Sequence, residues 1–232
     1  MTTLPPGLIR SCAVLALGAL AAACGPRPDG STTRVSRDTL CADVNNAYEC
    51  AQKVEDLRLV ETDIGVERSG DTLVIPVPGG EHVRLVNEDA GGPENVFYSY
   101  RDHLKDAGYH VVDVHYWEGS AHILVDDSTG RETRVMGPPV ASPDGRRLVV
   151  ASAAGVAGYS PNELQVWRVT PAGLELEWEV QPDDWGAADP RWIDARTVRF
   201  QRTRHDCANN EPVCYDEAML RLRDGEWEVR TP

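Results

Sequence analysis

The 232-residue sequence has no hydrophobic run long enough to cross a membrane as a helix. Its longest uninterrupted apolar run, from Cys12 to Ala23, falls short of the roughly 20 residues that a ~30 Å hydrocarbon core requires. Lysine is also scarce. The sequence contains only Lys53 and Lys105, and the other basic residues are arginines. A retained transmembrane helix is therefore not expected, and any membrane attachment needs another basis.

Signature motifs of common enzymes are missing as well. The sequence contains no Gly-x-Ser-x-Gly nucleophile motif, no Walker phosphate loop, no Gly-x-Gly-x-x-Gly dinucleotide motif and no His-Glu-x-x-His zinc motif. The acidic segment 126–130 does not have the spacing of a calcium loop and is explained as a hairpin turn. No cofactor is therefore expected, and no enzyme class is indicated by motif.

Positive charge is in deficit. Acidic residues number 37 against 23 basic residues, and the formal net charge is −14. Such a chain does not suit binding to nucleic acid or adhesion to anionic lipid through charge. A basic partner or a bound cation remains open.

The first 23 residues have the features of a signal peptide. A short lead ending in Arg10 precedes the apolar run, which has the length of a signal-peptide core. The run ends in Leu20-Ala-Ala-Ala-Cys24-Gly25, which resembles the lipobox of bacterial lipoproteins. That resemblance implies cleavage before Cys24 and attachment of fatty acids such as palmitate to it, and two acyl chains give a stable lipid anchor. The alternative is an ordinary secretory signal with an incidental cysteine.

The resemblance also implies a location. In Gram-negative lipoproteins, a residue other than aspartate after the cysteine, here Gly25, directs the protein to the outer membrane, so we expect the cell envelope and a domain that faces the periplasm. Residues 24–38 are rich in Pro, Gly, Ser and Thr without an apolar period, which predicts a tether with a span of roughly 20 Å. Residues 39–232 then form a single domain.

The remaining cysteines of the mature chain form two sequence-local pairs, Cys41 with Cys50 and Cys207 with Cys214. An oxidising envelope favours two disulfides. The alternative for the second pair is a metal site that includes His205, although the spacing is not that of a standard zinc motif.

One helix is expected near the start of this domain. Apolar residues recur at three- and four-residue intervals between 38 and 60. In one continuous helix, however, Cys41 and Cys50 would lie ~13 Å apart on opposite faces, too far for a disulfide. Asn46 followed by Glu49 is a capping-box pattern, which predicts a helix over residues 47–58 with Cys41 folded back onto its first turn.

The rest of the domain reads as a mainly β antiparallel meander. Roughly eleven short alternating runs are separated by turn residues, for instance 71–77 and 82–86 around Pro78-Gly-Gly80. Residues 93–107 suit either a helix or a strand, the Leu174 to Val180 run predicts a strand with one buried face, and segment 185–192 is expected to be a loop. Ser142-Pro-Asp-Gly145 resembles the turn of TolB-like and WD40-like propeller repeats. A propeller-like sheet, a sandwich and an open barrel all remain possible.

Two groups of residues are candidates for a functional site. On a strand, Asp113 and His115 share a face and His122 follows on the next strand, so the three side chains could form a metal or acid–base site. The alternative is the polar side of a half-buried sheet. Trp185 and Trp192 could bind glycan or peptide if exposed, and the alternative is that they fill the core of a domain with two phenylalanines.

The sequence therefore predicts a cell-envelope lipoprotein whose mainly β domain is a non-enzymatic binding or assembly module. Its partner would be another envelope protein or a glycan, reached through strand edges or turn-rich loops. The alternative is a metal-dependent hydrolase or another envelope enzyme that uses Asp113, His115 and His122.

Overall fold

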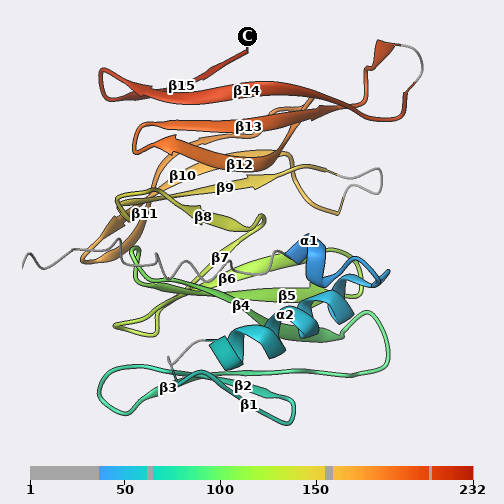
Figure 1. Cartoon of the computed structure of the whole chain (residues 1–232), viewed down its shortest axis with the longest axis vertical. Helices are drawn as coiled ribbons and strands as arrows, with labels where there is room; N and C mark the ends of the chain where they lie inside the picture. Colours follow the sequence, from blue (N-terminus) through green and yellow to red (C-terminus); the bar gives the residue numbers. More distant parts are fainter. Residues whose placement is uncertain (1–36, 62–64, 155–158, 209–210, 232) are drawn as a thin grey trace, which may run out of the picture. The chain divides into compact units, whose positions relative to one another are not determined.

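A computed structural model describes residues 37–61, 65–154, 159–208 and 211–231 (Figure 1). The expected signal peptide 1–23, Cys24 and the tether up to residue 36 lie outside the described residues. No helix within the described ranges is long and apolar enough to span a membrane.

Two short helices precede the sheets, α1 (Arg37–Leu40) and α2 (Ala47–Glu61). The carboxamide Oδ1 of Asn46 accepts hydrogen bonds from the backbone N–H groups of Tyr48 and Glu49 at 2.9 and 3.2 Å. These bonds satisfy two of the free N–H groups at the start of α2, so the helix begins at Ala47 as the cap predicts.

Both expected disulfides are present. Cys41 follows α1 and is bonded to Cys50 in the first turn of α2, with their Cα atoms 5.3 Å apart. Cys207 is bonded to Cys214 with a Cα–Cα distance of 5.7 Å. The α1 helix was not expected from the sequence, and it includes residues 37 and 38, which were predicted to belong to the tether. The first disulfide holds α1 against α2.

The domain is mainly β, as predicted, and its strands form four separate antiparallel sheets among the described residues. Within each sheet, neighbouring strands are consecutive in the sequence. Sheet A contains β1 (Glu67–Ser69), β2 (Thr72–Pro76) and β3 (His82–Val86). Sheet B contains β4 (Val96–Leu104), β5 (Tyr109–Tyr116), β6 (Ser120–Asp126) and β7 (Glu132–Val135).

Sheet C contains β8 (Pro139–Ala141), β9 (Arg147–Ser152), β10 (Glu163–Thr170) and β11 (Gly173–Val180). Sheet D contains β12 (Gly186–Asp194), β13 (Thr197–Arg204), β14 (Cys214–Arg223) and β15 (Glu226–Arg230). None of the four closes into a barrel. The four sheets form the predicted antiparallel meander, and consecutive small meander sheets also occur as the blades of propellers.

Sheets B and C are packed on both faces, and their strands β5 and β9 are buried on both sides. Along β5, Val112 and Val114 pack in a cluster with sheet A, whereas Val111 packs in a second cluster with sheet C. Likewise, Leu148 of β9 faces sheet B and the neighbouring Val149 faces sheet D. Successive side chains of a strand point to opposite faces, which explains the near-continuous apolar runs of these two strands.

In three segments the structure either decides between two predicted elements or differs from the predicted one. Residues 93–107 contain the strand β4, not a helix. The expected loop 185–192 is mostly strand β12, and Pro190 is tolerated there because β12 is the edge strand of sheet D and pairs only with β13.

The alternation expected for Leu174 to Val180 is interrupted by a bulge. Val166 pairs with Trp178 and Trp167 pairs with Leu176, so Glu177 is the extra residue. Leu174 therefore packs toward sheet B, Trp178 toward sheet D, and Leu176 is 44% exposed. The prediction of one continuous buried face on β11 is thus wrong, because a bulge reverses the faces of the residues on either side.

Candidate functional site

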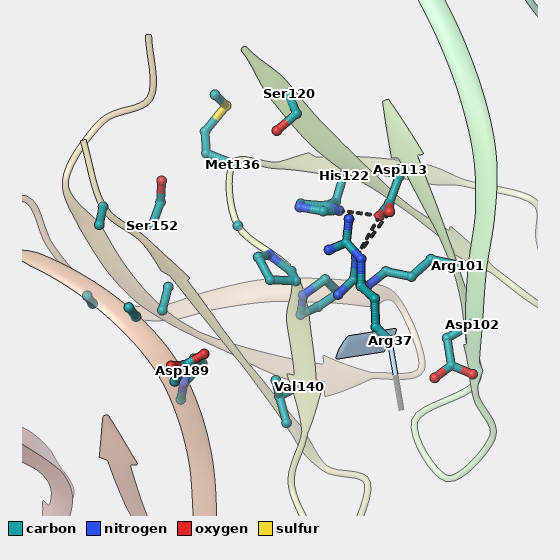
Figure 2. A pocket seen from close by; sticks show the side chains of 18 of the residues that line it. Arg37, Arg101, Asp102, Asp113, Ser120, His122, Met136, Val140, Ser152 and Asp189 are labelled. Atoms are coloured by element: carbon teal, nitrogen blue, oxygen red, sulfur yellow. Dashed lines mark hydrogen bonds and ion pairs between the residues drawn. The ribbon is translucent and has the colours of Figure 1, made fainter. Parts of the chain in front are cut away.

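A cavity of about 840 Å³ lies where the first strands of sheets B, C and D come together. Its walls come from β4, β8 and β12, with additions from β5, β6 and β9 and from the two helices (Figure 2). A volume of this size is within the ~300–1,000 Å³ range of small-molecule sites. We call it the inner-strand cavity.

Small residues keep this cavity open. Gly137, Ala141, Ala153 and Ala188 are among its lining residues. A side chain at Gly137 would collide with the backbone oxygen of Ala151, so only glycine fits there. Small apolar residues therefore line much of the cavity on sheets C and D, which also contribute Ser152, Asp189 and Arg191, while sheet B contributes most of the buried polar groups.

Those polar groups centre on the buried carboxylate of Asp113 on β5. Its Oδ1 lies 2.8 Å from Nδ1 of His122 on β6, which is the directly opposite residue in the sheet. Nη1 of Arg101 on β4 donates to both carboxylate oxygens, at 3.2 and 3.0 Å. The side chains of Asp113 and His122 are only 7% and 9% exposed. We call these three residues, together with Arg37, the Asp113 cluster.

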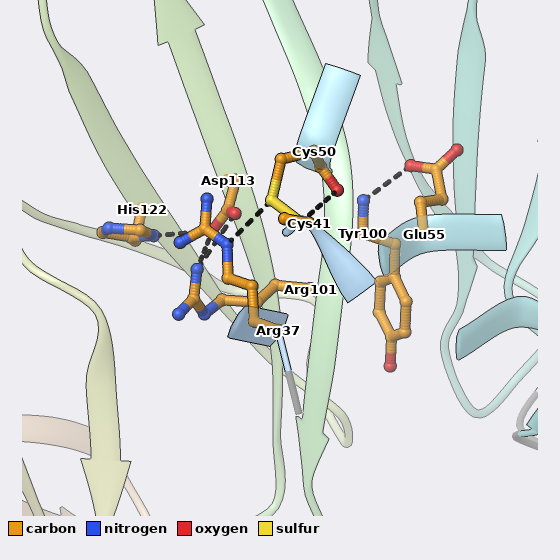
Figure 3. Close-up of polar contacts among 8 residues, drawn as sticks. All are labelled: Arg37, Cys41, Cys50, Glu55, Tyr100, Arg101, Asp113 and His122. Carbon is orange, nitrogen blue, oxygen red and sulfur yellow. Dashed lines mark hydrogen bonds and ion pairs between the residues drawn. A yellow bond between two sulfur atoms is a disulfide. The ribbon is translucent and has the colours of Figure 1, made fainter. Parts of the chain in front are cut away.

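A β-bulge aims Arg101 into this cluster. Tyr100 pairs with Val112 and Asp102 pairs with Val111, so Arg101 has no partner in the ladder. The backbone N–H of Tyr100 donates instead to Oε2 of the buried Glu55 on α2, at 2.6 Å (Figure 3). Helix α2 therefore supports the irregular backbone that re-aims the arginine.

The N-terminal disulfide positions the fourth member of the cluster. Figures 2 and 3 both show the guanidinium of Arg37 beside that of Arg101 and next to Asp113. Nε of Arg37 donates to Sγ of Cys50 at 3.4 Å. Because Cys50 is covalently joined to Cys41 one residue after α1, the disulfide holds Arg37 over the cavity.

The electrostatics favour the ionised form of Asp113. Burial on its own would raise the pKa of this carboxyl, but the hydrogen bond from His122 and the positive charge of Arg101 lower the pKa to about 2. An ionised carboxylate can only accept hydrogen bonds, so Nδ1 of His122 carries a proton and Nε2 is the ring atom left for other partners.

His115 also lines the cavity but is not bonded to the pair. Its ring lies 5.4 Å from that of Tyr48 in an edge arrangement, and its Nε2 has no hydrogen-bond partner among the described residues. Burial lowers the pKa of His115. The structure thus brings Asp113, His115 and His122 to one cavity, as their alternation predicts, but only Asp113 and His122 interact directly. Within the described part of the chain, no group of three or more His, Cys, Asp or Glu side chains is arranged to hold a metal ion.

The two tryptophans proposed for binding lie between sheets C and D. Trp185 packs 5.8 Å from Phe200, and Trp192 packs 6.1 Å from Trp227. Nε1 of Trp192 donates to the backbone oxygen of Val140 at 3.0 Å. Both rings are partly buried against the core, which favours their structural role.

Sequence reasoning missed Arg37 and Arg101. Arg101 belongs to the cluster through a bulge, and Arg37 through a helix that one disulfide holds. Neither residue is part of a motif, and strand alternation does not place a bulged side chain.

A second polar network lies on β4 and β5 outside this cavity. The rings of His103 and His110 stack with centroids 4.5 Å apart, and Nδ1 of His110 lies 3.0 Å from the hydroxyl of Tyr100. Burial, together with the charge of His103, lowers the pKa of His110 to about 4. Nε2 of His103 is 3.4 Å from Asp127, so this network connects β4 to the turn after β6.

Comparisons with known proteins do not identify a family. No protein-family model matches the chain, and no curated protein matches it. One solved structure, an S. cerevisiae complex of Dbp5 bound to Nup159, Gle1, IP6 and ADP, contains a chain similar over 72% of this chain at 8% identity, with a TM-score of 0.36. The match spans 46% of that chain. A likeness at this level carries no argument about function.

Proposed function

We propose that this chain is a lipid-anchored cell-envelope protein that binds a small ligand in the inner-strand cavity. The observation that carries the proposal is the buried, oriented pair of Asp113 and His122, which faces a cavity of about 840 Å³. Cavities with an apolar wall and a few convergent polar groups are the usual form of a ligand site.

The envelope location is supported by the lipobox-like segment before Cys24 and by the chemistry of the cysteines. Both sequence-local pairs form disulfides in the domain. Disulfides persist in oxidising compartments such as the periplasm and are rare in the cytosol. The domain therefore suits an exported protein.

Binding is favoured over catalysis because the cluster lacks a nucleophile in contact with His122. Ser120 and Ser152 line the cavity, but no hydrogen bond joins either hydroxyl to His122 among the described residues. In nucleophilic catalysis, the base lies within hydrogen-bond reach of the nucleophile. The Asp113–His122 bond nevertheless has the geometry that orients a general base, so a hydrolase that activates water through Nε2 of His122 is the second candidate.

The ligand can be sought directly. The full chain is extracted from membranes in mild detergent and its bound small molecules are identified by native mass spectrometry. Ala188 lines the cavity and is partly buried, so Ala188→Phe should block the site. The control is Ala90→Phe, because Ala90 lies on an exposed loop.

The proposal expects one defined ligand mass on the natural chain and on the Ala90→Phe variant, and its loss from Ala188→Phe. Equal retention by both variants, or no bound molecule on any of the three proteins, would overturn it. If the ligand is consumed on prolonged incubation, and this stops in His122→Gln, the hydrolase candidate is correct instead.

The lipid anchor has its own test. Changing Cys24 to Ser removes the only acceptor that the lipobox resemblance offers. Fatty-acid labelling should then disappear, and the domain should move to the soluble fraction. Unchanged membrane retention of Cys24→Ser contradicts the anchor.

A further inference from the structure

The Asp113 cluster holds more hydrogen-bond donors than the protein provides acceptors for. A guanidinium group carries five N–H donors and no acceptor. Arg101 uses only Nη1 on Asp113, and no acceptor among the described residues receives a bond from its Nε or Nη2. The side chain of Arg101 is only 23% exposed, so water has limited access to these free donors.

Arg37 adds to this surplus. Its single hydrogen bond among the described residues runs from Nε to a disulfide sulfur of Cys50, and sulfur is a weak acceptor. Nη1 and Nη2 therefore have no acceptor within the described part of the chain. Figure 2 shows both guanidinium groups on the cavity side of Asp113.

The charges of the cluster are also unbalanced. Two guanidinium groups face one carboxylate, which leaves one positive charge in a chain of formal net charge −14. The remaining charged residues of the lining are Asp102, Asp189 and Arg191. Asp102 accepts the backbone N–H of His103, and Asp189 and Arg191 lie on β12; Figure 2 shows Asp102 and Asp189 apart from the cluster. Arg37 is exposed to solvent and Arg101 is only 23% exposed, and an anion stabilises a cation more strongly the less water reaches it.

We propose that the inner-strand cavity recognises the oxyanion group of its ligand, a carboxylate or a phosphate, through Arg37 and Arg101. This inference rests on the proposed ligand-binding function and specifies its chemistry. The planar fork of a guanidinium matches both oxyanions with paired hydrogen bonds. Nε2 of His122 faces the same space and contacts the remainder of the ligand.

The test measures binding of inorganic phosphate and of acetate to the full chain in a non-ionic detergent. Thermal unfolding is followed at increasing phosphate or acetate, with sodium chloride at matched ionic strength as the reference. A ligand that binds only the folded state raises the unfolding temperature in a saturable way. At least one of the two oxyanions should do so beyond the effect of chloride.

Arg37→Gln is the decisive variant, because Arg37 makes no hydrogen bond to another charged side chain among the described residues, and its loss should not disturb folding. Hydrogen bonds to charged groups contribute about 1.5–3 kcal/mol, so the dissociation constant should rise roughly ten- to hundredfold. Arg84→Gln is the matched control, since Arg84 is exposed on β3 and the net charge changes equally.

The Cys41–Cys50 disulfide provides an independent test of the inference. The double variant Cys41→Ser with Cys50→Ser frees α1 and should weaken oxyanion binding as much as Arg37→Gln does. The double variant Cys207→Ser with Cys214→Ser should leave binding unchanged, because that disulfide lies in the connection between β13 and β14.

Two results would overturn the inference. One is the absence of saturable stabilisation by either oxyanion; the other is an equal loss of binding in Arg37→Gln and Arg84→Gln. Its failure is distinguishable from failure of the proposed function. If native mass spectrometry finds a neutral ligand that Ala188→Phe excludes, the cavity is a binding site but the oxyanion assignment is wrong.

Discussion

Removing the contacts of Glu55 should lower the stability of the folded domain more than most single substitutions do. The carboxylate accepts bonds from Nε and Nη2 of Arg68, both at 2.7 Å, and from the backbone N–H of Tyr100 at 2.6 Å. Its side chain is 8% exposed and that of Arg68 is 21% exposed. Glu55 therefore joins α2 to sheet A and to the bulge of sheet B.

Glu55→Ala removes the only carboxylate bonded to Arg68 among the described residues, so the guanidinium keeps only its bonds to the backbone oxygens of Tyr98 and Asp71. It also removes the bond that the carboxylate accepts from the backbone N–H of Tyr100. Removing one partner of a buried ion pair costs about 3–5 kcal/mol. For a domain of this size, each kcal/mol lowers the unfolding temperature by roughly 2–4 °C, so the expected decrease is roughly 6–20 °C. The measurement is thermal and urea unfolding followed by circular dichroism.

The control is Glu228→Ala on β15, where the pair with Arg230 is about half exposed. Exposed pairs contribute ~0–1 kcal/mol, so this variant should unfold close to the natural chain. If Glu55→Ala and Glu228→Ala were equally stable, the reasoning that α2 is fastened through a buried carboxylate would be refuted.

Three further predictions concern single residues. Because the pKa of Asp113 is lowered to about 2, it contributes stability above pH 4 that is lost as the pH falls toward 2. Asp113→Asn should make the acid-side loss of stability smaller and cost about 2 kcal/mol at neutral pH by linkage, measured by urea unfolding against pH; an acid-side loss equal to that of the natural chain would contradict this. Burial, and to a lesser extent the charge of Glu179, raises the pKa of Glu163, so the stability of the natural chain relative to Glu163→Gln should fall as the pH rises above about 4.5. A difference between the two that does not change with pH would contradict this. Gly145 has a φ of +66° and lies against the backbone oxygen of Asp106, so Gly145→Ala should cost at least ~1 kcal/mol in the same assay, and a neutral effect would contradict the described packing of this turn.

The fold class could be predicted because strand alternation and turn residues are local signals. The hairpin β2–β3 and the cap at Asn46 follow from residues adjacent in the sequence. Strand β12 could not be predicted, because Pro190 and the neighbouring Gly and Asp residues are typical of loops and only an edge position accommodates them. The bulge at Glu177 was equally hidden, since nothing in the alternating sequence marks it; in the structure Glu177 forms an ion pair with Arg147 of β9.

The candidate site likewise contains residues that the sequence predicts and residues that it does not. Asp113 and His122 face each other on adjacent strands, and their register follows from alternation across a short turn. Arg101 and Arg37 reach the cluster only because a bulge and a disulfide override regular geometry. Long-range contacts of this kind leave no periodic pattern in the sequence, so the cationic part of the cavity could be found only in three dimensions.

The most direct measurement of the central claim is photo-cross-linking from within the cavity in intact cells. A photoreactive residue replaces Ser120, which is exposed and lines the cavity, and a control chain carries it at Ala90. The account predicts an adduct of one defined small mass at position 120 and none at position 90. The absence of any small-molecule adduct at position 120, or the same adducts at both positions, would contradict a ligand-binding cavity.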